Sequence, residues 1–394
     1  MRPELPQCGN LVPLIIMKRI LLISLLLVTF GSLPALAAPG ERRPIPCRIR
    51  DGENPELFIM TLGNVGTPLT QGLFFPDTDQ VRVTSGSVID HYYRDTLGIK
   101  YYKPIDKTHF PVPISGWCSW YYYFYEINEN EMKANARWLS DNLKDYGVTY
   151  VQVDDGWQGV GRGFGSNRDW TTINERFPGG MDKLAAYIKQ LGFKPALWLA
   201  PHGQSNPKVV KAHPNAFLLK PDGTSLSEGW EGNFLVDPSM PAGHAYLKDL
   251  FTTLTQWGYD YFKIDGQPCV VDEYQRLAEQ TQRPSTNSAA LYRATLQTIH
   301  ETIGSQRYLL GCWEIPLEGV GLVEGWRTGA DVVPGWGGFM IALDATMQWY
   351  FMHNVVWYCD PDTVMAHNPL TVEQARAWAT LQGLTGQALM RATG

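Results

Sequence analysis

Short apolar runs alternate with stretches of helical periodicity from residue 112 to the end of the chain. This alternation is typical of a parallel sheet built from βα units. Apolar residues recur every three or four positions over 242–257, which predicts a helix with one buried face. Asn128 and Glu131 form a capping-box pattern at the start of another predicted helix. The remaining helices with clear periodicity are predicted over residues 128–146, 181–191 and 289–303.

Eight apolar runs have the length and composition of strands, and several of them follow a glycine that ends a predicted helix. The candidate strands are 113–117, 148–155, 193–201, 259–266, 307–314, 328–331, 355–360 and 387–391. Strands and helices in this order predict an α/β fold of the TIM (β/α)8 type, with an open doubly wound sheet as the alternative. The sequence stops at Gly394, directly after the eighth candidate strand, so we expect a barrel that is incomplete at its C-terminal end.

The segment before the barrel has a different texture. Residues 38–111 show no helical period and are rich in Gly, Pro, Thr and Val, which predicts a small β-rich N-terminal segment. We therefore divide the chain into a leading segment over 1–37, this β-rich segment, and a catalytic barrel over 112–394.

The first 37 residues have the pattern of a secretory signal peptide. Lys18 and Arg19 precede an apolar run over 20–33, and the small-x-small sequence at 35–37 is typical of a cleavage site. Met17 stands directly before the basic pair and is a possible true start. A membrane anchor is the rival interpretation, but the run is shorter than the roughly 20 residues of a spanning helix. We expect a secreted or periplasmic bacterial protein that has no membrane association after cleavage.

Composition excludes several classes of function. The formal net charge is −6, and no Lys/Arg run is present that could follow a phosphate backbone, so a nucleic-acid partner is not expected. The cysteines left after cleavage are odd in number and contain no CxxC, which argues against a disulfide scaffold or a zinc site. The histidines lack HxH and HExxH spacing. We expect no metal and no cofactor, with a carboxylate Mg²⁺ site at Asp154, Asp155 and Asp360 as the alternative.

Polar residues follow the candidate strands, where a barrel of this type carries its active site. They include Asp154 and Asp155, Trp198, Asp265, Cys312, Asp331 and Asp360. Lys263 and Asp265 are two residues apart on one strand and therefore point to the same face. A buried lysine keeps a neighbouring carboxylate ionised, as a nucleophile requires, with a structural ion pair inside the barrel as the alternative.

A second carboxylate facing Asp265 would complete the pair that glycosidic cleavage needs, because one acid attacks the anomeric carbon and the other protonates the leaving oxygen. Asp331 follows Arg327 by four residues and ends the sixth candidate strand. By itself Asp331 could equally cap a loop.

With these residues in view, the sequence resembles glycoside hydrolase family 36, the α-galactosidase or melibiase-like family, and more distantly family 27 of the same clan. The resemblance rests on motifs in a fixed order, which cover most of the chain from residue 116 to residue 388. They are Gly-Trp-Cys-Ser-Trp at 116–120, Val-Asp-Asp-Gly-Trp-Gln at 153–158, Asp-Trp at 169–170, Arg-Phe-Pro-Gly-Gly-Met at 176–181, Ala-Leu-Trp-Leu-Ala-Pro at 196–201, Tyr-Phe-Lys-Ile-Asp at 261–265, Leu-Leu-Gly-Cys at 309–312 and Arg-Thr-Gly-Ala-Asp at 327–331.

This resemblance implies a retaining double displacement with Asp265 as nucleophile and Asp331 as general acid and then base. Retention would place the two carboxyl groups roughly 5–5.5 Å apart. The resemblance also implies the residues that hold the sugar. Asp154 and Asp155 would bind galactose hydroxyls, Lys263 and Arg327 would hold the 2- and 3-hydroxyl side, Trp120 and Trp198 would wall the pocket, and Cys312 would line it. For the wall residues, plain barrel packing is the alternative.

The predicted substrate is a terminal α-galactoside in an oligosaccharide or polysaccharide. Trp313 and Glu314 follow Cys312 where relatives commonly carry small residues, so the sugar is less firmly predicted than the reaction. Alternatives are an α-N-acetylgalactosaminidase, a β-arabinopyranosidase, an α-glycoside transglycosylase with an apolar acceptor subsite, and a non-catalytic sugar-binding barrel.

Overall fold

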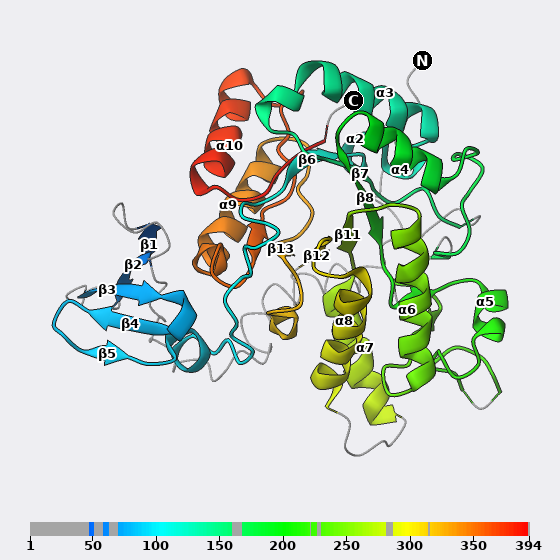
Figure 1. Ribbon diagram of the computed structural model, residues 1–394, viewed down its shortest axis with the longest axis horizontal. Coiled ribbons are helices and arrows are strands. Elements are labelled where there is room, and N and C mark those ends of the chain that lie inside the picture. The colour runs from blue at the N-terminus through cyan, green and yellow to red at the C-terminus, as the bar shows by residue number, and fades with distance from the viewer. Residues whose placement is uncertain are drawn as a thin grey trace. The chain divides into compact units, whose positions relative to one another are not determined.

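The computed structural model describes residues 47–50, 58–62, 70–159, 168–220, 222–226, 230–280, 287–313 and 316–392 (Figure 1). The chain divides into two compact units, whose boundary in the sequence lies between Ile99 and Lys100. The boundary expected from the sequence lies later, between residues 111 and 112. The predicted signal peptide over 1–37 lies outside the described residues.

The N-terminal unit contains a five-stranded antiparallel sheet in the order β1-β2-β3-β4-β5. The strands are β1 Cys47–Arg50, β2 Phe58–Leu62, β3 Thr70–Phe75, β4 Gln80–Val83 and β5 Val88–Ile89. Each strand pairs with its neighbour in the chain, as in a meander. The β-like texture of this part of the sequence therefore corresponds to strands.

The second unit is a barrel of eight parallel strands, as the sequence predicts. In chain order the strands are β6 Ser115–Cys118, β7 Tyr150–Val153, β8 Lys194–Leu199, β11 Tyr261–Ile264, β12 Tyr308–Gly311, β13 Gly325–Arg327, β14 Tyr358–Asp360 and β15 Leu389–Arg391. Neighbours in the chain are neighbours in the sheet, and β15 pairs with β6. The Ala388 N–H donates to the Cys359 carbonyl over 3.1 Å, which links the β14 and β15 edges and nearly closes the barrel.

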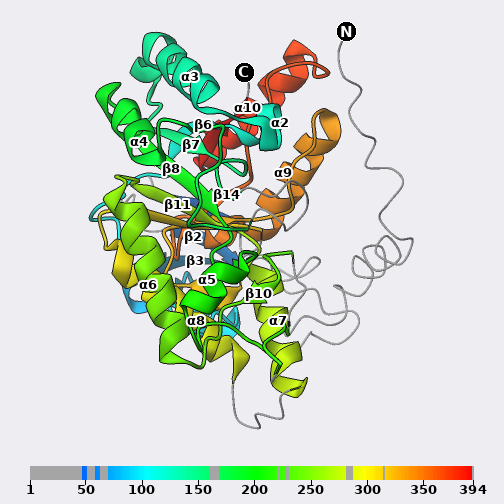
Figure 2. The same cartoon turned by 90° about the vertical axis from the view of Figure 1, so that its right-hand side faces the viewer.

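Helices separate the strands along the chain. They are α2 Trp120–Tyr123, α3 Glu129–Asn142, α4 Met181–Gln190, α5 Pro207–Ala212, α6 Pro241–Gln256, α7 Gln267–Gln280, α8 Ser288–Ile303, α9 Trp336–Trp349 and α10 Val372–Thr385. A two-stranded ladder of β9 Gly203–Gln204 and β10 Phe234–Leu235 lies between β8 and α6 in sequence. Figures 1 and 2 show α6 and α8 side by side, with α7 beside α8. None of the helices in the described part of the chain is long and apolar enough to span a membrane.

The four helices with clear periodicity are confirmed as α3, α4, α6 and α8. Asn128 caps α3 as expected, because its side chain accepts a hydrogen bond from the Glu131 N–H over 3.0 Å. The sixth strand was expected over 328–331, and this is wrong: β13 ends at Arg327. Trp326 anchors β13 by stacking on Trp357 at 4.7 Å between ring centroids, so the paired segment lies upstream and Asp331 lies in the loop.

The barrel interior is built in layers, because alternate residues of each strand point inward. The layer at the amino ends of the strands is aromatic: Tyr261 contacts Tyr150 and Tyr308 edge to face, with centroids 5.5 and 5.3 Å apart. Phe110 packs on Tyr308 at this end. Further along, inward positions on three strands are polar: Gln152 on β7, Lys263 on β11 and Asp360 on β14. Asp154 and Asp265 directly follow β7 and β11, and Asp362 follows β14 by two residues. The apolar floor therefore supports a polar upper layer.

Candidate active site

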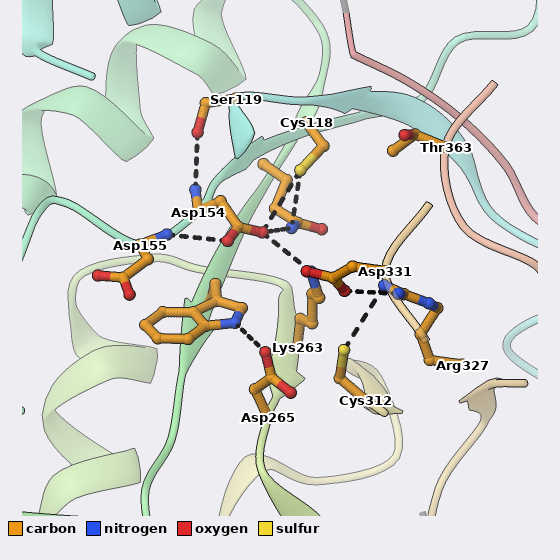
Figure 3. A network of polar contacts seen from close by, with 12 residues as sticks. Cys118, Ser119, Asp154, Asp155, Lys263, Asp265, Cys312, Arg327, Asp331 and Thr363 are labelled. Atoms are coloured by element: carbon orange, nitrogen blue, oxygen red, sulfur yellow. Dashed lines mark hydrogen bonds and ion pairs between the residues drawn. The ribbon is translucent and has the colours of Figure 1, made fainter. Parts of the chain in front are cut away.

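Asp265 and Asp331 come from different strands and face the same part of the barrel mouth (Figure 3). Asp265 directly follows β11, and Asp331 lies in the loop after β13. Cys312, which follows β12 between them in the sheet order, is influenced by both carboxylates: burial raises the pKa of its thiol most, and the charges of Asp265 and Asp331 raise it further. The structure therefore brings the two predicted catalytic acids together around Cys312.

Two neutral donors hold the Asp265 carboxylate. The Trp198 indole N–H donates to Oδ2 over 2.9 Å, and the Gly266 backbone N–H donates to Oδ1 over 2.7 Å. Gly266 has a φ of +72°, and a Cβ at this position would lie 2.7 Å from the Trp230 ring. Only glycine fits there without strain, so the turn after β11 fixes the orientation of the carboxylate.

A charged network holds Asp331 instead. One guanidinium nitrogen of Arg327 donates to Asp331 Oδ1 over 2.6 Å and to Asp362 Oδ2 over 2.7 Å. The Arg327 side chain is 1 % exposed, whereas that of Asp331 is 54 % exposed. Asp362 also accepts hydrogen bonds from the Tyr121 hydroxyl and the Val332 N–H. Asp362 thus fixes the position of the Arg327 guanidinium, which also bonds the more exposed Asp331.

The Arg327 charge affects the proton affinity of Asp331. The surrounding protein raises the pKa of the Asp331 carboxyl, but the charges of Arg327 and Lys263 and hydrogen bonds from Arg327 and Trp120 outweigh it. The pKa of Asp331 therefore lies below its ordinary value in the unliganded protein.

Lys263 pairs with Asp154 rather than with the predicted nucleophile. Its ammonium group donates to Asp154 Oδ2 over 3.1 Å, and Gln152 Nε2 donates to the same oxygen over 2.6 Å. Burial lowers the pKa of Lys263, but the Asp154 charge together with Cys312 and Cys118 outweighs it, so the pKa lies above its ordinary value and the side chain stays protonated. The expectation that Lys263 forms an ion pair with Asp265 is corrected: β8 lies between β7 and β11 in the sheet, and the Lys263 side chain reaches past it to the carboxylate that follows β7.

A second buried cation of the site, Arg168, pairs with Asp155. Arg168 donates to Asp155 Oδ2 over 2.7 Å, and both side chains are 3 % exposed or less. Gln158 donates to the other carboxylate oxygen over 2.7 Å. The Arg168 guanidinium also lies over the Trp230 and Trp198 rings, 4.4 and 5.1 Å from their centroids. This stack connects Asp155 to the tryptophan that holds Asp265.

The predicted wall residues lie near these acids with different exposure. Trp120 is half-buried and hydrogen-bonds Asp331. Trp198 is 2 % exposed and Cys312 is fully buried, so both pack within the barrel as well as bordering the acids. Arg327 Nη1 lies 3.7 Å from the Cys312 sulfur.

Sequence reasoning missed four side chains that hold the acids in place: Gln152, Gln158, Arg168 and Asp362. The signals were weak but present. Arg168 directly precedes the Asp-Trp motif at 169–170, and Asp362 follows the strand end at Asp360 by two residues.

Among the described residues, no group of three or more His, Cys, Asp or Glu side chains could hold a metal ion. Asp154 and Asp155, two of the carboxylates weighed for Mg²⁺, instead carry a lysine and an arginine as partners. The site presents two carboxylates of different surroundings, one oriented by neutral donors and the other by an arginine. This arrangement suits a nucleophile and a proton-transferring acid on opposite sides of one bond.

Sequence comparison connects the chain to known proteins. The melibiase family profile matches residues 82–308. A "Probable alpha-galactosidase" of Dictyostelium discoideum is 26 % identical over 260 residues, which cover 65 % of this chain and 55 % of that protein. A "Probable alpha-galactosidase B" of Neosartorya fischeri is 26 % identical over 314 residues, or 71 % of this chain and 63 % of that protein. The chain thus spans a little over half the length of these relatives.

Solved structures share the fold. An α-galactosidase from Thermus thermophilus in complex with stachyose has a TM-score of 0.60 and 23 % identity, covering 87 % of this chain and 75 % of that one. A family 27 β-L-arabinopyranosidase from Geobacillus stearothermophilus has a TM-score of 0.55 and 21 % identity, covering 71 % of both chains. At this level of identity the likeness establishes the barrel fold.

Proposed function

Because this chain belongs to the melibiase family, we propose that it is a retaining glycoside hydrolase that removes terminal α-galactosyl residues from oligosaccharides or polysaccharides. The observation that carries the proposal is the pair Asp265 and Asp331, which follow β11 and β13 and lie at the same barrel mouth (Figure 3). The curated relatives matched here are described as α-galactosidases, which supports the same substrate.

In the first step, a carboxylate oxygen of Asp265 attacks the anomeric carbon and forms a galactosyl ester. The bond from that carbon to the glycosidic oxygen breaks, and the leaving oxygen takes the proton of Asp331. In the second step, ionised Asp331 takes a proton from water as the water oxygen attacks the anomeric carbon. The ester bond breaks, and Asp265 leaves as a carboxylate while α-galactose is released.

The neutral donors on Asp265 suit the nucleophile, because Trp198 and Gly266 fix its direction without adding a cation that would compete for its charge. The Arg327 pair suits the acid–base residue in its ionised form during the second step. Protonation of Asp331 for the first step requires the bound substrate or an acidic medium to overcome this pair.

The remaining predicted residues recognise the sugar in this proposal. Asp154 and Asp155 are held by internal donors, and in this proposal their carboxylate oxygens accept hydrogen bonds from galactose hydroxyls. Lys263 and Arg327 serve the 2- and 3-hydroxyl side, and Trp120, Trp198 and Cys312 border the ring. The Thermus enzyme was solved with stachyose and with p-nitrophenyl α-D-galactopyranoside, which is consistent with a galactosyl pocket on this fold.

The subdivision of the family is a finer proposal. The motif set resembles family 36, whereas the comparisons point to neighbours of the family 27 type, among them a family 27 arabinopyranosidase. L-arabinopyranose has the ring hydroxyl pattern of galactose without the hydroxymethyl group. The same site with less room would therefore favour the arabinoside.

The test is release of nitrophenol from p-nitrophenyl α-D-galactopyranoside, compared with the α-glucoside, the α-N-acetylgalactosaminide and the β-L-arabinopyranoside. We expect the galactoside to give the largest kcat/KM and α-galactose to be the first product by proton NMR. Preference for another glycoside would change the sugar and leave the mechanism standing, whereas β-galactose as the first product would contradict retention. Galactosyl transfer to added sugar at high concentration would identify a transglycosylase.

We also propose export through the predicted signal peptide over 1–37, with the protein secreted or periplasmic. Its support is the basic pair, apolar run and cleavage pattern in the sequence. N-terminal sequencing of the protein from a bacterial host should give a start near Ala38, and retention of the leader in the purified protein would contradict the proposal.

A further inference from the structure

Two groups of aromatic side chains lie after the C-terminal ends of the barrel strands, and apart from Trp120 the proposed mechanism does not use them. In the first, Trp120 contacts Phe124 and Tyr125, with ring centroids 5.1 Å away in both cases. In the second, Trp336 stacks on Phe339 at 4.2 Å at the start of α9. Phe124, Tyr125 and Trp336 are 38–41 % exposed. We call the five side chains the aromatic shelf.

The two groups rest on one hydrophobic base. Trp120 and Phe339 both pack against the same cluster, which includes Val332 and Trp378. Val332 directly follows Asp331 in the chain. The cluster therefore joins both groups of the aromatic shelf to the residue next to Asp331, and Trp120 connects the shelf to the candidate active site.

Polar contacts tie the aromatic shelf to the acids. Trp120 hydrogen-bonds Asp331, whose side chain is 54 % exposed. Burial raises the pKa of the Tyr125 hydroxyl, and the charges of Asp155, Asp154 and Asp331 raise it further. The Tyr125 hydroxyl is therefore within electrostatic reach of the acids while its ring remains partly exposed.

The position of the general acid indicates which part of the substrate the aromatic shelf contacts. A general acid must touch the glycosidic oxygen, so the group that leaves lies on the same side as the acid. We propose that the aromatic shelf is the binding site for the leaving portion of the substrate, and that it takes a pyranose ring. This inference rests on the proposed function, because it uses Asp331 as the acid.

A pyranose fits the chemistry of the shelf better than a small alcohol. The C–H face of a sugar ring is apolar and packs against exposed indole and phenyl faces, as aromatic surfaces favour large flat partners. Its rim of hydroxyls needs hydrogen-bonding groups close by, which Tyr125 and the neighbouring acids supply. The shelf thus selects an oligosaccharide over a galactoside with a small leaving group.

The experiment compares two substrates that share the galactosyl group. Raffinose carries a pyranose ring as its leaving portion, whereas α-galactosyl fluoride carries none. In Trp336→Ala and Tyr125→Ala, kcat/KM for raffinose should fall about tenfold, the effect of one aromatic face, with the fluoride unchanged within about twofold. Trp138→Ala and Tyr146→Ala remove exposed aromatic rings from α3 and from the 3-10 helix after it, and should change neither rate. Equal losses on both substrates, or no loss on raffinose, would overturn the proposal.

Binding separates failure of the aromatic shelf from failure of the proposed function. Titration calorimetry on Asp265→Asn requires no turnover. This variant should bind raffinose about tenfold more tightly than free galactose, and the added Trp336→Ala change should remove that difference. If raffinose and galactose bind equally, the shelf is wrong even when hydrolysis occurs. If raffinose binding exceeds galactose binding but no galactoside is hydrolysed, the proposed function fails and the shelf stands as a sugar-binding surface.

Discussion

The two candidate catalytic acids differ in how the protein holds them. Asp265 receives hydrogen bonds from an indole and a backbone N–H, and its surroundings on β8 and β11 supply no direct cation. Asp331 receives a guanidinium that is itself anchored by a buried carboxylate. The difference teaches that one barrel mouth can orient an attacking group with neutral donors and control a proton-transferring group with charge.

The largest effect should follow from removing the nucleophile side. Asp265→Asn keeps the shape and one of the two contacts to the N–H donors, because the amide nitrogen cannot accept a hydrogen bond, and it loses the attacking carboxylate oxygen. We therefore expect kcat to fall by about 10⁴-fold or more. Steady-state hydrolysis of p-nitrophenyl α-galactoside measures the loss, and the thermal midpoint should stay within a few degrees. A variant with a near wild-type rate would show that the nucleophile is another residue.

The acid side should respond according to the leaving group. Asp331→Ala removes proton donation, which matters for raffinose and hardly for a leaving group that needs no proton. We expect kcat/KM for raffinose to fall about 10²- to 10³-fold, but that for α-galactosyl fluoride by less than about tenfold. Uniform loss on both substrates would indicate that Asp331 acts in binding or folding.

Asp362→Asn tests whether the anchor controls the acid. Without the Asp362 charge, Arg327 stabilises ionised Asp331 more strongly, so the pKa of Asp331 should fall further below its ordinary value. Since the acid must be protonated, the descending side of the raffinose pH profile should move to lower pH, with about a tenfold loss near neutrality. The fluoride profile serves as the internal control. A raffinose profile that does not move would separate Asp362 from the reaction.

The smallest expected effect concerns the stability of the nucleophile side. Glu231 is fully buried behind Gly266, and burial raises its pKa to about 7 from an ordinary 4.5. A raised folded-state pKa contributes stability that is complete below the ordinary value and lost as pH rises through about 7. Glu231→Gln should flatten the loss of thermal midpoint between pH 5 and 8 by a few degrees. Calorimetric scans at several pH values measure it, and parallel curves for both proteins would contradict the assignment.

Much of the barrel could be predicted from local pattern. The sequence predicts helices that end at a glycine, such as α4 and α6, and apolar strands such as β8. It can do so because hydrophobic periodicity and capping are local properties of the chain. The prediction of the sixth strand was wrong because it used local pattern alone. The residues at 328–331 look like a strand end, but Trp326 pairs with aromatic residues far along the chain, and that packing decides which segment is extended.

The acids of the site could also be predicted, but not their partners. Asp154, Asp265 and Asp331 follow strands, so fold topology brings them to one rim. Which cation each acid pairs with depends on distances in three dimensions: Lys263 lies two residues from Asp265 in sequence, yet it pairs with Asp154 at the end of β7, two strands away in the sheet. Arg168 comes from the loop region after β7, and no sequence period indicates that its guanidinium meets Asp155.

The account depends on Asp265 forming a bond to the sugar on the side opposite the acid. Incubation with 5-fluoro-α-D-galactosyl fluoride should expel fluoride and accumulate the galactosyl ester, since the ring fluorine slows its hydrolysis. Protease digestion and mass spectrometry then locate the adduct. We predict a single labelled peptide with the modification on Asp265, and a label on any other side chain would contradict the account.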